Sequence, residues 1–243
     1  MRLFKRMTDM RTRFCMLIVA LLSAVTAGAQ EIETSEVFAP SAERFRLAAH
    51  AGYGYRFGKV DPNMSASQRE FVNKLHHGLF LGADLSWFFR EQLGVGARVS
   101  NLRSITEGYG TITYEDGTKK SGSVRDQVDI LFAGPQLSYR FMGKAGRSAF
   151  LMNMALGYMA IRDRSKAVSE TLQIDGACLG FAMDLTYEYK ILDALWLGLQ
   201  LSALGGSVSS ATVSGAASTQ KTSLEEREGL AHVVVSAGIR YCL

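Results

Sequence analysis

Charged side chains occupy one face of several alternating runs in this sequence, opposite large apolar residues. The set comprises Arg44, Arg46, Arg56, Asp84, Arg98, Arg140, Asp184, Glu188 and Arg240. A charge removed from bulk water destabilises a protein unless it is paired, so charges of both signs on one face predict an ion-pair network or a wet interior. Asp84 and Arg98 form the best-founded pair, because a tight turn at Arg90 and Glu91 joins their segments and places them at nearly the same height. A network that plugs and stiffens the interior is the favoured interpretation, and a gated conduction path is the alternative.

Histidine and serine residues raise the question of catalysis, which requires a nucleophile and a base within hydrogen-bond reach of each other. Ser236 and His232 share one face of a predicted strand, but a rise of about 3.3 Å per residue separates them by about 13 Å. His76 and His77 point to opposite faces and do not form a metal pair. We therefore predict no catalytic residues, no metal site and no cofactor.

The segments that position these residues alternate with a period of two, which indicates β-strands. The predicted strands cover 43–57, 78–89, 93–100, 128–141, 150–158, 176–189, 195–203 and 230–243. The connections alternate between long ones (58–74, 103–126, 162–173 and 205–229) and short ones (90–91, 142–148 and 190–193). An up-and-down meander with every long loop at one end is typical of outer-membrane barrels, which have short periplasmic turns and long external loops.

The fourth predicted strand is less regular than the others. Val128 and Phe132 hold one parity and Leu137 holds the opposite one, so an extra residue is expected between them. Proline cannot donate to a strand ladder and marks a bulge or an edge within a sheet. We therefore predict a β-bulge at Gly134 and Pro135.

The large apolar face is expected to point outward, toward lipid. The interior of an eight-stranded barrel is just wide enough to be filled by side chains, and the bulky face would overfill it, whereas the face rich in Gly, Ala and Ser fits. Aromatic residues also gather at the strand ends, as membrane interfaces select. At the short-turn end they include Phe45, Trp87, Phe89, Tyr139, Phe141, Tyr187, Tyr189 and Tyr241. The sequence thus predicts an all-β fold, an eight-stranded antiparallel up-and-down transmembrane β-barrel, rather than a soluble one.

The N-terminus has the pattern of an export signal. Basic residues precede an apolar run from Phe14 to Val25, and small residues follow it, with cleavage expected between Ala29 and Gln30. The predicted organisation is a signal peptide at 1–29, a periplasmic tether at 30–42 and a barrel at 43–243. Without the signal peptide the basic and acidic residues balance, so nothing in the composition favours nucleic-acid binding.

Over nearly all of 43–243 the chain resembles the small outer-membrane barrels of the OmpX and OmpA transmembrane-domain type. The resemblance rests on the alternating strands, on the phrase from Gly134 to Phe141, and on the terminal alternation that ends at Tyr241. It implies a barrel whose C-terminal strand is recognised by the barrel-assembly machinery. Such proteins usually finish on an aromatic residue, whereas this chain finishes on Leu243. The resemblance is one of architecture, which does not fix function.

These features predict an exported protein of the outer membrane of a Gram-negative-type bacterium, with outer-membrane lipid as its surroundings. The favoured role is structural or surface-interacting, with an extracellular ligand at the long loops. A small gated, porin-like channel is the alternative, and a lipid-modifying enzyme is the second alternative.

Overall fold

A computed structural model describes residues 44–58, 66–113, 119–167, 170–215 and 219–243. Contacts divide the chain into two units, 1–41 and 42–243, and the second is described below. The signal peptide (1–29), its cleavage point at Ala29 and Gln30, and the tether (30–42) lie outside the described residues.

Within the described ranges the second unit is almost entirely β-structure. Its elements are β1 (Phe45–Arg56), α2 (Ala66–Leu75), β2 (His77–Phe88), β3 (Leu93–Thr113), β4 (Lys119–Met142), β5 (Ser148–Ala167), β6 (Glu170–Lys190), β7 (Leu195–Ser214), β8 (Thr219–Gly229) and β9 (His232–Cys242). Among the described residues, no helix is both long enough and apolar enough to cross a membrane.

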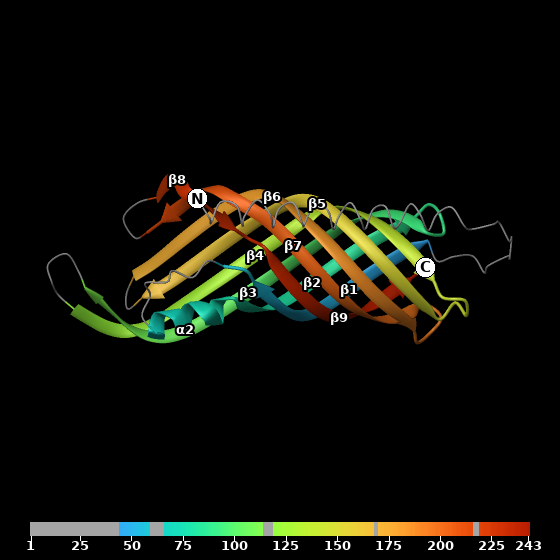
Figure 1. Ribbon diagram of the computed structural model, residues 1–243, viewed down its shortest axis with the longest axis horizontal. Coiled ribbons are helices and arrows are strands. Elements are labelled where there is room, and N and C mark those ends of the chain that lie inside the picture. Colours follow the sequence, from blue (N-terminus) through green and yellow to red (C-terminus); the bar gives the residue numbers. More distant parts are fainter. Residues whose placement is uncertain (1–43, 59–65, 114–118, 168–169, 216–218) are drawn as a thin grey trace, which may run out of the picture. The chain divides into compact units, whose positions relative to one another are not determined.

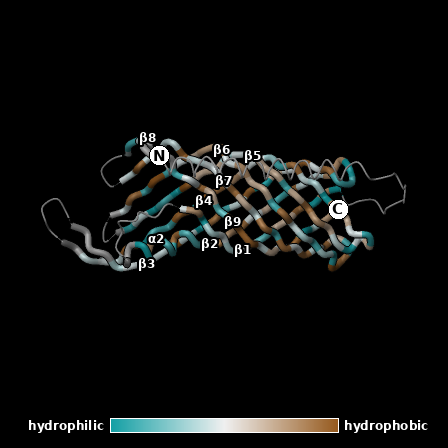
Figure 2. Tube along the Cα trace, in the orientation of Figure 1, coloured by the Kyte–Doolittle hydropathy of each residue, from teal (hydrophilic) through white to brown (hydrophobic). Residues whose placement is uncertain are grey.

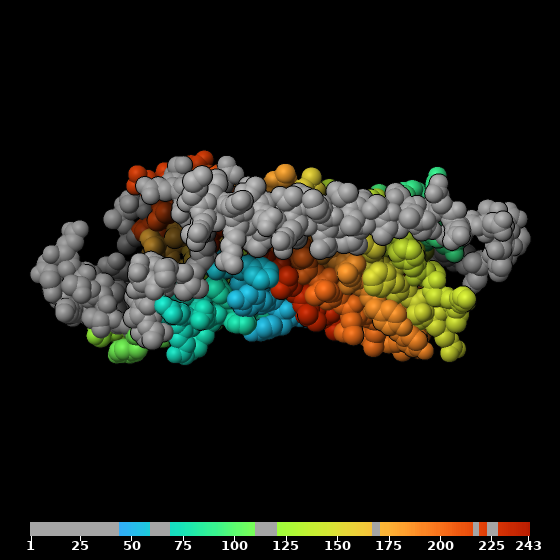
Figure 3. Space-filling model, viewed as in Figure 1, coloured from blue at the N-terminus to red at the C-terminus, as the bar shows by residue number. Residues whose placement is uncertain are grey.

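Eight of these strands form a closed antiparallel ring. Each strand from β1 to β7 pairs with the next, β7 also pairs with β9, and β9 pairs with β1. The first strand, blue in Figures 1 and 3, therefore lies against the last strand, red. This ring confirms the predicted eight-stranded up-and-down barrel.

The long connections are more ordered than the sequence predicted. β3 and β4 stay paired from the Arg103–Asp129 pair to the Thr113–Lys119 pair, so most of 103–126 is a hairpin arm that projects at one end of Figure 1. The segment 162–173 likewise continues β5 and β6. The segment 205–229 contributes the end of β7 and a ninth strand, β8, that pairs with β7 alone, and part of 58–74 forms α2. Loops were expected in these segments, and that expectation was wrong. In the arms both faces of each strand are largely polar, so the alternation of apolar and polar residues that indicates a strand is missing from the sequence.

The predicted bulge at Gly134 and Pro135 is also wrong. The pairing of β4 with β3 and with β5 keeps one register on both sides of these residues. What the structure has instead is a close approach of two backbones: a Cβ added at Gly134 would lie 2.7 Å from the Cα of Gly157 on β5. The irregular pairing occurs elsewhere, between Gly176 and Gly180 of β6, where the register with β7 shifts.

The outer surface of the ring is apolar, as the sequence predicted. Leu81, Leu197 and Val235 are each about half exposed or more, at 54%, 49% and 63%. Asp84, Arg98 and Asp184 are buried instead. Figure 2 shows the resulting alternation of hydrophobic and hydrophilic residues along the strands. A soluble barrel would hold the apolar face inside, so this polarity fits a barrel surrounded by hydrocarbon.

Candidate functional site

The interior of the ring contains a layer of paired charges. Asp84, Arg98, Asp184, Glu188 and Arg240 are all at most 2% exposed. Successive side chains of a strand point to opposite faces, and each of these residues lies on the face that points inward, next in sequence to a more exposed residue on the outer face. Five of the nine charges predicted for the inward face therefore lie within this buried layer, and Arg46, at 1% exposed, joins them.

Two carboxylates of this layer share one arginine. Arg98 of β3 donates to Asp184 of β6 across the lumen, and its Nε lies 3.9 Å from Asp84 Oδ1 on the neighbouring strand. The register pairs Asp84 with Arg98 directly, as the turn geometry predicted. Bonds across the lumen fix the cross-section of the ring as well as neutralising the charges.

Glu188 is the centre of the second group. It accepts from Arg46 of β1, whose Nε lies 3.3 Å from Oε2, and Arg240 Nε lies 3.1 Å from Oε1. Arg240 Nη1 also donates to the carbonyl oxygens of Gly198 and Gly238 at 2.9 and 2.7 Å. One carboxylate thereby connects β1, β6 and β9 near the point of ring closure.

Arg140 and Arg44 lie apart from this layer. Arg140 is at the short-turn end, where Nε and Nη2 donate to the carbonyl oxygen of Glu91 at 3.2 and 3.1 Å and the guanidinium stacks on Phe88. Arg44, expected inside, is exposed at the start of β1. Both lie near the ends of their strands, where the interior opens.

His50 is the interior residue whose role the sequence did not reveal. Its Nε2 lies 3.2 Å from Asp84 Oδ2 and its Nδ1 lies 3.4 Å from Ser236 Oγ. The sequence pattern already placed His50 on the inward face, but its diagonal contact with Ser236 depends on the β1–β9 register, which pairs His50 with Gly238 and Gly52 with Ser236 and which only ring closure sets. Ser236 therefore pairs with His50 of β1 and not with His232 of its own strand.

A carboxylate, an imidazole and a hydroxyl in this order form the constellation of serine hydrolases. Here all three side chains are at most 4% exposed. They also lie in the middle of the lumen, with apolar residues on either side of them along the strands. This placement favours a role in holding β1, β2 and β9 together.

The charged layer lies between two apolar clusters. The order along β2 is Phe80, Asp84, Phe88, and on β7 the uncharged polar residues Gln200 and Ser202 lie between Leu204 and Trp196. The larger cluster, here called the plug, lies toward the long arms and contains Leu75, Phe80, Leu102, Val128, Ile130, Phe132, Ala155, Met159, Ile161, Ala182, Leu204, Val208, Leu230 and Val234. The smaller cluster, here called the lower cap, lies toward the short turns and contains Phe88, Ala149, Leu151, Trp196 and Cys242.

Helix α2 closes the plug from the side of the arms. Leu75 belongs to the plug and Phe71 packs against it, and Phe71 also approaches Gly108 of the β3–β4 arm. A Cβ at Gly108 would lie 3.0 Å from the Phe71 ring. The helix therefore contacts both the plug inside the lumen and the β3–β4 arm.

The aromatic residues predicted for the membrane interface lie at the short-turn end of their strands. Phe45, Trp87, Phe89, Phe141, Tyr187, Tyr189 and Tyr241 are exposed, and the Tyr139 hydroxyl donates to Gln92 Oε1 at 2.8 Å. Tyr53, Tyr55, Phe57 and Tyr158 are exposed at the opposite end. Both cysteines of the described residues, Cys178 and Cys242, are free thiols, and no metal-binding cluster occurs among those residues.

An outward apolar band with aromatic residues at both ends, around an eight-stranded ring with a charged interior, defines a transmembrane β-barrel of the outer-membrane type. Several solved structures share this fold. The barrel is similar to Neisserial surface protein A (9% identity over 82% of this chain and 97% of that one, TM-score 0.49). It is also similar to a major outer membrane protein from Thermus thermophilus (13%, 82% and 99%, TM-score 0.49) and to OprG from Pseudomonas aeruginosa (14%, 83% and 97%, TM-score 0.45). No protein-family model matches the sequence, and no curated protein matches it.

Proposed function

We propose that this protein is a closed barrel of the outer membrane of a Gram-negative-type cell, and that its arms form a binding surface outside the cell. The short connections and the C-terminus lie at one end of the ring, and the arms lie at the other. In outer-membrane barrels the short turns face the periplasm. The arms therefore face outward.

The observation that carries the proposal is the plug. Its side chains come from seven strands of the ring and from α2, and each member is at most 8% exposed. Toward the short turns the plug is followed by the charged layer, whose groups bond across the lumen, and then by the lower cap. An ion would have to pass both an apolar layer and a network of fixed charges.

The arms have the properties of a binding platform. Beyond the apolar band, β3 and β4 form a continuous ladder whose outward side chains are polar apart from a few such as Ile105 and Tyr109. The Tyr109 side chain is 82% exposed near the tip. Residues on rigid, protruding strands bind at a lower cost in conformational entropy than residues on a mobile loop.

Assembly in the membrane supplies a further partner. β9 completes the ring by pairing with β1 and β7, and its outward face carries Val233, Val235, Ile239 and Tyr241. The apolar outward face of β9, with Tyr241 near its end, supports recognition of this strand by the barrel-assembly machinery.

Planar-bilayer recording tests the closed state against the channel alternative. The wild-type barrel is expected to give no current steps, whereas Phe80→Ser combined with Phe132→Ser is expected to conduct. The matched control is Phe89→Ser combined with Phe141→Ser, which changes two outward rings. Steps from the wild type, abolished by Arg98→Ala, would overturn the proposal in favour of a gated channel.

Surface binding is tested with a barrel whose arm is shortened by joining Ser104 to Val128 through an Asn-Gly turn, which suits a hairpin. Cells that display equal amounts of each form are compared on an array of purified surface proteins and glycans. A shortened β5–β6 arm, with Asp163 joined to Ile174, is compared in parallel and separates the contribution of this arm from that of the β3–β4 arm. Identical binding patterns for all three forms would contradict a role for the arms.

A further inference from the structure

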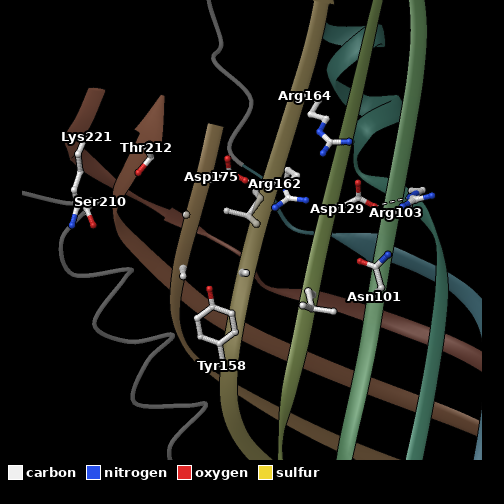
Figure 4. A pocket seen from close by; sticks show the side chains of 15 residues that line it. Asn101, Arg103, Asp129, Tyr158, Arg162, Arg164, Asp175, Ser210, Thr212 and Lys221 are labelled. Carbon is white, nitrogen blue, oxygen red and sulfur yellow. Dashed lines mark hydrogen bonds and ion pairs between the residues drawn. The ribbon is translucent and has the colours of Figure 1, made fainter. Parts of the chain in front are cut away.

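A second candidate site lies on the outer wall of the barrel, outside the lumen. It is an open concavity of about 790 Å³ at the level where the apolar band gives way to the arms. Figure 4 shows Arg103, Asp129, Arg162 and Asp175 across one side of it, and Ser210, Thr212 and Lys221 across the other. The first group comes from β3 to β6, and the second from the β7–β8 hairpin.

The concavity lies beside two irregularities in the strand pairing. The pairing of β6 with β7 is interrupted between Gly176 and Gly180, and the β7–β8 pairing shifts register between Val208 and Ser210. Gly176 and Ser210, which flank these irregularities, both line the concavity.

A single row of paired residues crosses the concavity. The register places Arg103 beside Asp129, Asp129 beside Arg162, and Arg162 beside Asp175. The row continues to Thr212 and Lys221. Charges of alternating sign therefore lie side by side on neighbouring strands.

Each of three arginines of this site donates from Nε to a side chain of a neighbouring strand. Within the described residues, Arg103 Nε donates to Asp129 Oδ1 at 2.6 Å, and Arg162 Nε donates to Asp175 Oδ1 at 2.9 Å. Arg164 Nε donates to Gln173 Oε1 at 3.1 Å. The side chains of Arg103 and Arg162 are half exposed, at 52% and 54%. The terminal amino groups are thus oriented by a fixed Nε and face the concavity, a geometry suited to bidentate binding of a phosphate.

The lower part of the concavity is apolar. Leu131, Tyr158, Ala160 and Ala177 line it, and Leu131 and Tyr158 continue the outward apolar band. Ala160 and Ala177 are paired across β5 and β6, so two small side chains lie between larger ones. A soluble anion would use only the basic part, whereas an amphiphile would use both.

We propose that this concavity binds a phosphorylated lipid of the surrounding leaflet. A headgroup phosphate lies against Arg162 and Arg164 near the middle of the concavity, Arg103 and Lys221 at its two sides attract the rest of the anionic headgroup, and one acyl chain runs over Ala160 and Ala177. The site depends on the barrel being in a membrane, but not on the lumen being closed or on the arms binding a partner.

Native mass spectrometry of the refolded full-length barrel tests the site with defined lipids. The probes are a diphosphorylated glucosamine lipid, the same lipid after phosphatase treatment, and inorganic phosphate. The variant is Arg103→Gln with Arg162→Gln. Removal of two interfacial charges is expected to weaken retention of the phosphorylated lipid roughly 30-fold.

The matched control is Arg125→Gln, which removes an arginine from the β3–β4 arm outside the concavity. Arg125 is as exposed as the two test residues, at 53%, and is ion-paired with Glu107 at 3.5 Å. This control is expected to retain the lipid at the wild-type level, and heat-modified gel migration confirms that each variant has folded. Equal loss in the control, or equal retention of the phosphatase-treated lipid, would overturn the proposal. Displacement of the lipid by millimolar inorganic phosphate would also overturn it, in favour of a site for soluble anions.

Discussion

The plug and the charged layer fill the same barrel with opposite chemistry. Phe132 and Met159 represent the plug, which is stabilised by burial and by close packing. Glu188 and Arg98 represent the charged layer, in which each group depends on a partner from another strand. Removal of an apolar side chain leaves a cavity, whereas removal of one charge leaves its partner buried and unpaired. The charged layer is therefore the more sensitive of the two to single changes.

The largest effect is expected for Glu188→Ala. Arg46 and Arg240 would both lose their carboxylate while remaining buried. A loss of about 4 kcal/mol in the free energy of unfolding is expected, measured by urea titration of tryptophan fluorescence in lipid vesicles. Glu107→Ala removes an exposed carboxylate on the β3–β4 arm and is expected to change stability by less than about 1 kcal/mol. Equal losses in the two variants would show that the network contributes nothing.

Phe132→Ala tests the plug. The ring is 1% exposed within the plug, so its removal creates a cavity and is expected to destabilise the barrel by about 3 kcal/mol. Phe141→Ala on the same strand removes a ring from the outward face and provides the comparison. The same urea titration measures both variants. A larger loss for Phe141 than for Phe132 would be inconsistent with a packed plug.

Gly157→Ala tests the close approach of β4 and β5. The added Cβ would lie 2.2 Å from the carbonyl oxygen of Ala133, so one backbone must move. A loss of about 2 kcal/mol is expected from this overpacking. At Gly205 of β7 no atom of the described residues lies within 4 Å of an added Cβ, so Gly205→Ala is expected to have little effect. If the two variants unfold at the same urea concentration, the strands do not approach each other as described.

The smallest effect is expected for Asp163→Asn, beyond the plug on β5. Partial burial, together with the charge of Asp126, raises the pKa of Asp163 to about 6 despite the opposing effect of Arg56. The folded state then binds more protons than the unfolded state between about pH 4 and pH 6, so stability falls as the pH rises through this window.

Replacement by Asn should remove this fall and stabilise the barrel by about 1 kcal/mol at pH 7.5, with little change at pH 4, after allowance for partial exposure. Urea titrations at the two pH values provide the measurement. An equal gain at both pH values would exclude ionisation of Asp163 as the cause.

The contrast between the plug and the charged layer also explains where sequence reasoning failed. Around the charged layer the inward residues are small, polar or charged, so the alternation along each strand identifies the lumen directly. In the upper half of β4 the inward residues Val128, Ile130 and Phe132 are as apolar as the outward ones. The alternation of apolar residues therefore does not distinguish the two faces there. The apolar positions change from even to odd numbers between Phe132 and Leu137, which suggested a bulge at Gly134 and Pro135, but the register is continuous through these residues.

The sequence by itself determined the strands of the ring, their order and which face meets lipid, because a period of two between large and small residues depends only on local geometry. It also indicated the Asp84–Arg98 pair, since a tight turn aligns neighbouring strands. Tertiary structure alone decided the bonds that cross the lumen, the contact of His50 with Ser236, and the row from Arg103 to Lys221. These depend on the register at ring closure and on the register of β6, β7 and β8, which are set by contacts between residues distant in the sequence.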